Sequence, residues 1–526
     1  MLTDLRTDHL PTVPAGAVLV VGSGAAGIAL ATALAGAGRD VVLLESGGDV
    51  ADPTAVDRGA ALNGGTADAL PYEGLDVGRA RVLGGTTQLW HGQCMRLHPV
   101  DLAERSWVPR SGWPLTLRDL DPWYAAAERF LDVSGRGYGE DRWADVPRLA
   151  PVPWDRSRLR HDFTEYMRRP YLGTEHRDAL VASPHVRVVV EATATRVLLD
   201  DAGRATGVEV ALPGGGRAAL RGAEVVLAAG TLENARLLQL SDPAGVGLGD
   251  GREHTGRYLQ DHPIIRTGEV LAPDFRVLQD RYVVLRKDGR RLFPKVRLAP
   301  EAQERERLLD ATAVFVHEHD HPGLRAAHDL GRAVRARRVP PGALRTAATA
   351  ATALGPVAHA AYRRAVHGLP LGARPSHVWL QLWVEQAPDP ARRVVLDRDR
   401  LDPHGQPRAR VTWTCDDEEL RTTRTMSRWV AEDLERLGVG RVRPLPAQTD
   451  DDAWRRTVTD AAHPAGTTRM ATSARDGVVG TDLEVHGVPG LSVVGGSVFP
   501  TSGYANPTLT VVALALRLAA RLLPGA

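Results

Sequence analysis

The feature that most constrains the fold is a glycine-rich turn near the start of the chain. The run Ala17–Val21 is continuously apolar, as expected of a parallel strand buried on both faces, and Gly22-Ser23-Gly24-Ala25-Ala26-Gly27 follows it at once. The helical stretch Ile28–Ala37 and the apolar run Val41–Leu44, which ends at Glu45, complete a βαβ unit. In such a turn the glycines allow a tight bend, a close approach to a pyrophosphate and close helix packing. We therefore predict a dinucleotide site, with phosphates at the helix N-terminus and Glu45 hydrogen-bonded to a ribose.

The order of the other segments predicts that this domain is built from both ends of the chain. Val186–Leu227 reads as a small antiparallel excursion that returns to the main sheet, and Leu491–Leu523 reads as strand, glycine-rich turn and helix. Between them, alternating segments such as Val378–Glu385 indicate an antiparallel sheet. We expect an α/β fold in which a Rossmann-type domain of residues 1–266 and 456–526 carries an inserted α+β substrate domain of residues 267–455.

An Ala- and Arg-rich segment at residues 325–367 interrupts the inserted domain. It predicts two or three helices, broken at Pro340-Pro341. A lid, an interface and a plain insertion fit this segment equally well.

Composition argues against several classes of partner. With 65 basic and 64 acidic residues the formal charge is +1, which gives no reason to expect nucleic acid or an anionic membrane. Lysine occurs only at Lys287 and Lys295, a bias that we attribute to genomic base composition. Cys94 and Cys415 are too few for a disulfide framework or a zinc cluster, so we expect reduced thiols and a cytoplasmic location, with a single bridge as the alternative. The longest apolar tract, near Val511–Leu523, contains two arginines and is too short to span a bilayer.

Several motifs, in order along nearly the whole chain, resemble those of the glucose–methanol–choline (GMC) oxidoreductase family. Within that family the likeness is greatest to pyranose oxidases and related bacterial sugar oxidases. The motifs are Arg81–Trp90, Trp107–Pro114, Val225–Asn234, Gly256–Pro263, His463–Met470 and Ala505–Thr510.

The resemblance implies an FAD cofactor. Covalent relatives attach the flavin through a His just before the loop tryptophan; here Leu89 stands before Trp90, so we expect non-covalent FAD, with His91 as the alternative attachment site. The residues expected to bind FAD are Gly22, Gly24, Ala26, Gly27, Glu45, Ser46, Arg81, Gly84, Gly85, Thr87, Trp90, His91, Ala194, Ala229, Gly230, Asn234, Gly496, Ser497, Asn506, Pro507 and Thr508.

The resemblance also implies the chemistry. Oxidising an alcohol removes a hydroxyl proton and a hydride from the same C–OH group, so the protein must offer a base with a pKa near working pH. A neutral imidazole meets this need, and the family motif gives the role to His463. Asn506 is expected to donate its amide to the same oxygen and to stabilise developing alkoxide charge.

The substrate contacts are less specified by the sequence. Along His377–Glu385 one face alternates His, Trp, Gln, Trp and Glu, so Gln381, Trp383 and Glu385 are candidates to stack on and hydrogen-bond a sugar. The same face equally fits an aromatic strand packed against a neighbouring strand. The run His317-Glu318-His319-Asp320-His321 lacks an H-E-x-x-H signature and predicts a solvated loop, so no metal is expected.

Together these observations predict an FAD-dependent oxidation of an alcohol on a sugar, glycoside or similar polyhydroxylated molecule. Oxidation of a sterol-like or other apolar alcohol, and a non-redox flavin-containing lyase on the same fold, are the alternatives. The electron acceptor, oxygen or another molecule, stays open.

Overall fold

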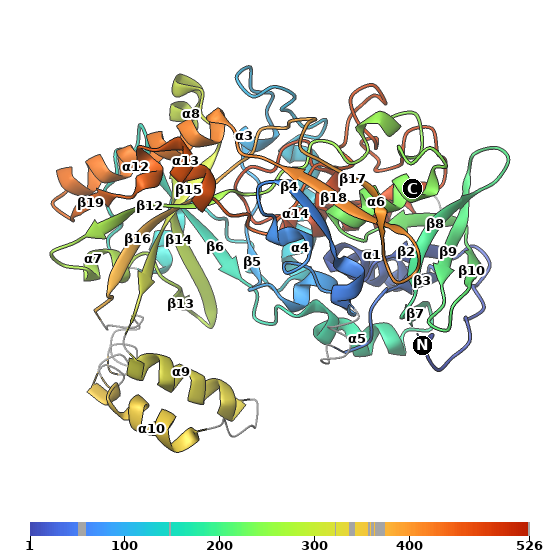
Figure 1. The fold of residues 1–526 in the computed structure, drawn as a ribbon, viewed down its shortest axis with the longest axis horizontal. Coiled ribbons are helices and arrows are strands. Elements are labelled where there is room, and N and C mark those ends of the chain that lie inside the picture. Colours follow the sequence, from blue (N-terminus) through green and yellow to red (C-terminus); the bar gives the residue numbers. More distant parts are fainter. Residues whose placement is uncertain are drawn as a thin grey trace.

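A parallel sheet and an antiparallel sheet occupy opposite ends of the molecule, which confirms the predicted α/β fold (Figure 1). The computed structural model describes residues 1–50, 59–146, 149–320, 322–335, 342–355, 358, 362 and 374–523. Among these residues no helix has both the length and the apolar character needed to cross a membrane. Both cysteines, Cys94 and Cys415, are buried and free, so the alternative of a bridge between them does not hold.

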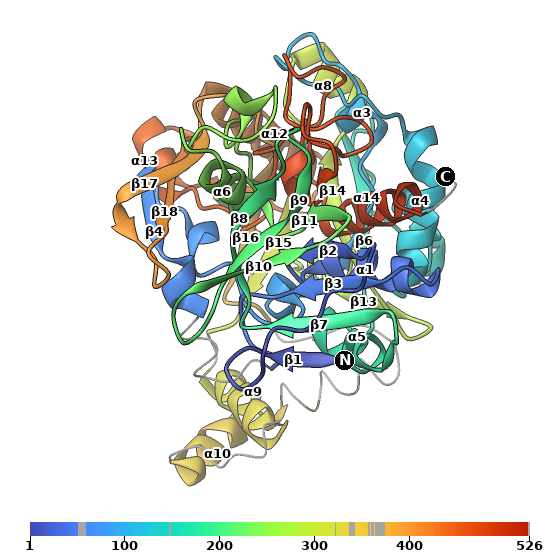
Figure 2. The ribbon, with the colours of Figure 1, turned by 90° about the vertical axis from the view of Figure 1, so that its right-hand side faces the viewer.

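The parallel sheet gathers strands from both ends of the chain. Its order is β1-β7-β3-β2-β11-β20, and every neighbouring pair is parallel. Figure 2 shows the sheet from the side on which the N-terminus lies. The strands are β1 (Leu2–Asp4), β2 (Val18–Val21), β3 (Val41–Leu44), β7 (Val186–Val190), β11 (Glu224–Leu227) and β20 (Leu491–Val493).

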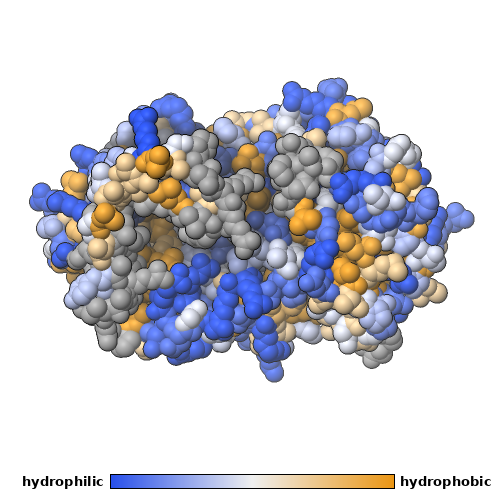
Figure 3. All heavy atoms as spheres, turned by 90° about the horizontal axis from the view of Figure 1, so that it is seen from below, coloured by the Kyte–Doolittle hydropathy of each residue, from blue (hydrophilic) through white to orange (hydrophobic). Residues whose placement is uncertain are grey.

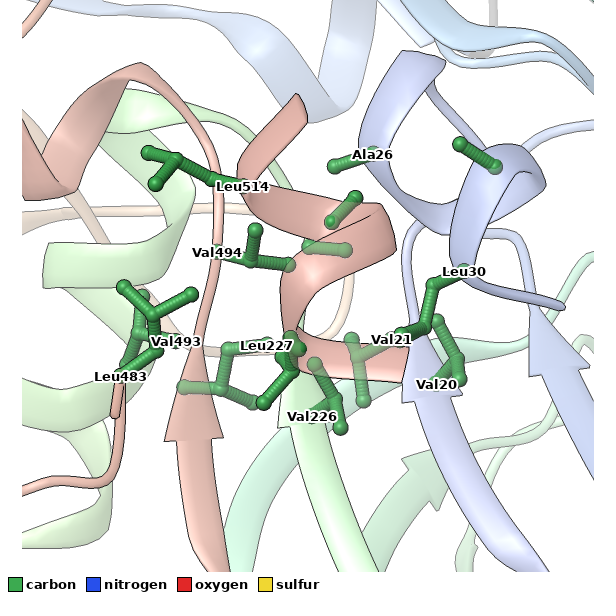
Figure 4. Close-up of a cluster of buried hydrophobic side chains, with 14 of the residues drawn as sticks. Val20, Val21, Ala26, Leu30, Val226, Leu227, Leu483, Val493, Val494 and Leu514 are labelled. Atoms are coloured by element: carbon green, nitrogen blue, oxygen red, sulfur yellow. The ribbon is translucent and has the colours of Figure 1, made fainter. Parts of the chain in front are cut away.

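The core of this half explains why its strands lack polar alternation. Every residue of β2 and β3 is buried because helices cover the sheet, so both faces of the strands must be apolar. Helix α1 (Ala25–Gly36) packs against α14 (Thr508–Arg521), the helix that closes the C-terminal segment. Figure 4 shows Val20, Leu227 and Val493 from three adjacent strands gathered with Leu514 of α14.

Strands β8 (Thr193–Leu199), β9 (Ala205–Ala211) and β10 (Arg217–Arg221) form the predicted antiparallel excursion between β7 and β11. Further helices of this half include α3 (Pro99–Leu102), α4 (Leu117–Phe130), α5 (Leu172–Ala182) and α6 (Thr231–Ser241).

The antiparallel sheet supplies the wall on the other side of the candidate site. Its order is β19-β12-β16-β15-β14-β6-β5, with β13 paired to β14. The members are β5 (Gln93–Cys94), β6 (Leu159–Tyr166), β12 (Ile264–Leu271), β13 (Leu285–Lys287), β14 (Arg290–Leu298), β15 (Ala311–Glu318), β16 (His377–Val384) and β19 (Arg441–Pro444). Helices α7 (Arg276–Gln279), α8 (Pro300–Glu306), α12 (Asp417–Arg436) and α13 (Asp451–Thr457) accompany it.

Four strands depart from the predicted division of the chain. β5 and β6 lie within residues 1–266, yet β6 pairs with β14 of the antiparallel sheet and β5 extends that sheet by pairing with β6. Conversely, β17 (Arg393–Leu401) and β18 (Pro407–Trp413) form a small sheet with β4 (Gly65–Ala69). The two halves therefore exchange strands, and the boundaries at 266 and 455 stay a prediction.

The predicted helical segment contributes a hairpin that projects from the end of the antiparallel sheet (Figure 1). It consists of α9 (Pro322–Arg335) and α10 (Ala343–Ala351); Pro340-Pro341 and most of 356–373 lie outside the described residues. Seen from that side, hydrophilic and hydrophobic residues are intermingled over the surface (Figure 3).

Candidate active site

The turn between β2 and α1 has the shape that a phosphate needs. A Cβ on Gly22, whose φ is +100°, would lie 2.6 Å from Ala228 O, and one on Gly27 would lie 1.9 Å from Gly22 O. Gly24 differs, because a Cβ there would meet no atom within 4 Å. Gly24 is also the N-cap of α1, and no side chain caps the helix. The first turn of α1 therefore has no side-chain cap and has open space beside Gly24, a combination that fits a dinucleotide pyrophosphate.

The second predicted loop lies directly against this turn. A Cβ on Gly85 would come within 3.0 Å of Gly24 Cα, and Gly84 N donates to Ser23 O over 3.1 Å. Glu45 is buried, and its Oε2 accepts from Ser23 Oγ (2.5 Å) while its Oε1 accepts from Gly47 N (3.0 Å). Ser23 N (3.2 Å) and Ser46 Oγ (3.3 Å) also donate to Oε2 and Oε1, respectively, so each oxygen of Glu45 already accepts two hydrogen bonds from its own chain, and a ribose hydroxyl would have to replace one of them.

A third group of predicted residues links β11, α6 and the turn after β20. Asn234 Oδ1 accepts from Ala229 N (2.8 Å), and its Nδ2 donates to Ser497 Oγ (3.0 Å). A Cβ on Gly496 would lie 2.8 Å from Pro464 O, so only glycine lets this turn approach the loop that follows His463. Asn234 thereby joins the end of β11 to the turn after β20, and Gly496 of that turn packs against the loop that follows His463.

The remaining predicted cofactor residues differ in accessibility. Ala26, Thr87 and Asn506 are buried, whereas Ser46, Arg81, Trp90, Ala194, Ala229, Pro507 and Thr508 are half-buried. Arg81 NH1 donates to Ser46 Oγ over 3.0 Å, and Trp90 Nε1 donates to Pro170 O over 2.5 Å. His91 and Leu89 are both exposed.

A buried carboxylate fixes the backbone that carries His463. Asp261 accepts hydrogen bonds from the main-chain N–H groups of His463 (3.0 Å) and His262 (2.7 Å), and from the hydroxyl of Tyr72 (2.7 Å). Burial and then the nearby Asp460 raise the pKa of Asp261 to about 7, while these hydrogen bonds oppose the rise. Asp261 thus holds both histidines by their backbones.

The side chains of the two histidines are in direct contact. The Nδ1 atoms of His262 and His463 are 3.1 Å apart, and the rings meet edge to face. Burial first, and then the charge of Lys295, lower the pKa of His463 to about 4. Burial, His463 and Lys295 likewise hold the pKa of His262 well below its usual range. Both rings are therefore neutral at pH 7, and one Nδ1 donates while the other accepts.

Three further side chains complete the candidate site. The ring of Trp383 on β16 lies 5.8 Å from that of His463, and its buried Nε1 has no hydrogen-bond partner among the described residues. Lys295 of β14 places Nζ 5.7 Å from the centre of the Trp383 ring and 3.5 Å from Asn506 Oδ1. Distant parts of the chain thus bring His463, Asn506 and Trp383 to one place.

The other predicted substrate residues occupy different surroundings. Gln381 lies two residues from Trp383 on the same half-exposed face of β16. Glu385 follows the strand and is fully buried, and Arg105 binds both of its oxygens at 2.6 and 2.7 Å. Because an internal arginine occupies this carboxylate, we leave Glu385 out of the proposed substrate contacts.

In the His-rich run, His317 and Glu318 belong to β15, and His321 lies outside the described residues. The strand therefore extends into the segment predicted to be a loop, because Glu318 and His317 pair with the start of β16.

The sequence analysis missed His262 and Lys295. His262 stands within the Gly256–Pro263 motif, but its spacing from His463 carries no sign of contact. Lys295 did carry a signal, because lysine is rare in this chain. That rarity was attributed to base composition alone.

Comparison with known proteins identifies related sequences. Two domain models, both described as GMC oxidoreductase, match residues 176–264 and 388–515. The chain is 28% identical to the C-glycoside 3-oxidase of Microbacterium trichothecenolyticum over 83% of this chain and 74% of the relative. It is 25% identical to the 2-methyl-1,2-propanediol dehydrogenase of Mycolicibacterium austroafricanum over 95% and 94% of the two chains.

A solved structure extends the likeness to the whole fold. The formate oxidase of Aspergillus oryzae superposes with a TM-score of 0.58 at 18% identity, over 97% of this chain and 99% of the other. At this identity the likeness concerns the fold.

Proposed function

Because this chain belongs to the GMC oxidoreductase family, whose members include oxidases and dehydrogenases that act on CH–OH groups, we propose that it oxidises a hydroxyl of a sugar, glycoside or similar polyhydroxylated molecule to a carbonyl. The observation that carries the proposal is the neutral His463, whose Nδ1 is bound by His262 and whose ring faces Trp383. This leaves Nε2 as the ring nitrogen for a substrate hydroxyl.

The family implies a flavin, and the residues of the nucleotide end fit FAD. The open space at Gly24 and the uncapped start of α1 suit its pyrophosphate, and the buried Glu45 lies beside the same turn, where it holds Ser23. When bound, FAD supplies the acceptor for the hydride that leaves the alcohol carbon. Helix α14 also begins without a side-chain cap, and its positive end would stabilise negative charge on the reduced cofactor. We propose non-covalent attachment, because Leu89 occupies the position of the linking His and His91 is exposed.

His463 serves as the general base in this proposal. For Nε2 to accept a proton, His463 must carry its own hydrogen on Nδ1 and donate it to His262 Nδ1, which then carries its hydrogen on Nε2. His262 in this way sets the tautomer of the base, as a buried carboxylate does in a hydrolase triad. Asp261 holds the backbones of both residues, so the pair is aligned before substrate arrives.

Asn506 and Trp383 would contact the substrate. The amide of Asn506 donates to the reacting oxygen and stabilises alkoxide charge as the proton leaves. Trp383 offers a flat apolar ring and an unpaired N–H, a combination that suits a sugar ring and one of its hydroxyls. Gln381, on the same face, is the next candidate for a hydroxyl contact. The relative from Microbacterium trichothecenolyticum, by its name, acts on a glycoside, which supports this class of substrate.

Anaerobic flavin reduction tests the proposal. Sugars, glycosides and aminoglycosides are mixed with the enzyme without oxygen, and bleaching of the flavin absorbance is followed. With a substrate in hand, His463→Ala should reduce the rate by about 10²–10⁴-fold. His185→Ala, which alters a histidine paired with Asp40 far along the sheet, should leave it unchanged. If no alcohol that the enzyme turns over bleaches the flavin, the redox proposal fails.

Two finer points are tested separately. Acid precipitation should release all the flavin colour, and colour retained in the pellet would contradict non-covalent attachment. Reoxidation of the reduced enzyme by air, compared with artificial acceptors, distinguishes an oxidase from a dehydrogenase. A cytoplasmic location stays a prediction based on the two free thiols.

A further inference from the structure

Lys295 is one of the few lysines of this chain, and its side chain is buried. Only two of the 65 basic residues are lysines. The side chain of Lys287 is 47% exposed, whereas Lys295 as a whole is 4% exposed. In the sheet, Lys295 of β14 lies opposite Asp162 of β6. An ammonium group buried to this extent is costly unless its environment uses the charge.

The nearest carboxylate is already engaged by other groups. Asp162 is bound by His98 Nε2 at 2.7 Å and by the hydroxyl of Tyr504, and Arg297 Nε is 3.7 Å away. Among the described residues no carboxylate forms an ion pair with Lys295, and the hydrogen bond found for Nζ is the one to Asn506 Oδ1 at 3.5 Å. The ammonium is therefore directed at the candidate site and is not neutralised by a partner of its own.

This contact decides which end of the Asn506 amide faces the substrate. The oxygen and nitrogen of an amide have nearly the same shape, so only their partners determine the orientation. An ammonium group can donate but cannot accept, so the oxygen of Asn506 must face Lys295. The Nδ2 group then turns away from Lys295, free to donate to another atom.

We propose that Lys295 is a positioning residue that fixes the amide of Asn506 with its N–H donors directed at the substrate oxygen. This inference rests on the proposed function of Asn506. Apart from Lys287 and Lys295, the basic residues of the chain are arginines. The broad planar guanidinium of an arginine is not interchangeable with a compact ammonium beside a single amide oxygen.

The same charge acts on the neighbouring histidines. Lys295 is, after burial, the second cause of the low pKa of His463, so its removal should raise that pKa and move the acid limb of the rate profile to higher pH. Burial lowers the pKa of Lys295 itself to about 8, and Asp162 opposes this effect. The titratable groups that face Lys295 are Asp162 and Tyr504 on one side and His262 and His463 on the other.

The kinetic test compares Lys295→Met, which removes the charge and the donors, with Lys287→Met as the matched control. We expect Lys295→Met to slow flavin reduction by about 10–100-fold, less than the loss of a whole oxyanion donor, and to raise the pH of the acid limb. The double variant with Asn506→Ala should be no slower than Asn506→Ala alone, because Lys295 acts through the amide. The proposal is overturned if the double variant shows the product of the two single losses in rate. It is also overturned if Lys295→Met reduces the flavin at an unchanged rate or leaves the acid limb at the same pH.

A second measurement needs no substrate and no Lys295 variant. Lysine labelled with ¹³C at Cε should give two side-chain signals in the flavin-loaded protein, one for each lysine, and each can be titrated. The Lys295 signal should titrate near pH 8 and shift in Asn506→Ala, while the Lys287 signal should not move. A Lys295 signal indifferent to Asn506→Ala would refute the contact. If the signal responds but no alcohol reduces the enzyme, the proposed function fails and the contact stands.

Discussion

The buried ion pair of Arg105 and Glu385 allows a test of whether Glu385 serves the stability of the fold or the binding of substrate. The two side chains are 1% and 0% exposed and are joined by two hydrogen bonds of 2.6 and 2.7 Å across 280 residues of sequence. The main-chain N–H of Asp310 also donates to Glu385, over 3.0 Å. Glu385→Ala would leave the buried guanidinium of Arg105 without its hydrogen-bonded carboxylate, and only the more distant charges of Asp101 and Asp310 would remain to act on it. Removing one partner of such a pair costs about 3–5 kcal/mol of folding free energy.

Two further variants separate pairing from simple loss of a side chain. Replacing both partners, Arg105→Met with Glu385→Leu, should restore most of the stability, because no unpaired charge remains. Glu432→Ala removes the partner of Arg158 from a pair whose side chains are 49% and 37% exposed, and should cost at most about 1 kcal/mol.

The change in folding free energy of each of the three variants is measured by urea unfolding, followed by tryptophan fluorescence. All proteins are loaded with flavin at one fixed flavin concentration, because bound flavin adds to stability. The KM of each variant is measured alongside. If Glu385→Ala were no less stable than Glu432→Ala but had a raised KM, the carboxylate would belong to the substrate site and the reasoning above would be wrong.

Three other outcomes follow from the site. The final acid limb of flavin reduction should have its half-point near pH 4, because protonation of the proposed base His463 removes its acceptor and its pKa is about 4, while titration of Asp261 near pH 7 adds a separate, partial step; complete loss of reduction with a half-point near pH 6.5 in a pH-jump experiment would contradict the burial of His463. Gly24→Ala should fold normally, since its Cβ meets no protein atom within 4 Å, but should be purified with little flavin; full flavin content measured by absorbance would exclude the phosphate position. Asp261→Asn replaces an acceptor of N–H groups with an amide that is itself a donor, and should lose about 1–3 kcal/mol of stability and slow reduction; calorimetry showing no change would argue against its role in holding the loop.

The cofactor half could be predicted from sequence because its signals are local. A strand buried on both faces, a turn that excludes side chains and an apolar helix occur within Val18–Gly36, and each is dictated by neighbours in the chain. The division into two halves was less predictable. Strand β6 comes early in the sequence but pairs with β14. Such pairing depends on packing between distant parts of the chain, which a short stretch of sequence does not reveal.

The candidate site shows the same limit at the level of single side chains. The alternation of side chains between the two faces of a strand correctly predicts that Trp383 and Gln381 share one face of β16. The strand ends at Val384, so the same rule does not hold for Glu385, which is buried. His463 stands in a recognisable motif, yet the features that suit it to the proposed role of base come from His262, 201 residues earlier, and from Lys295 on another strand. A motif can therefore predict a candidate for the reacting residue, whereas the tautomer and the pKa of that residue are set by partners that only the folded chain brings to it.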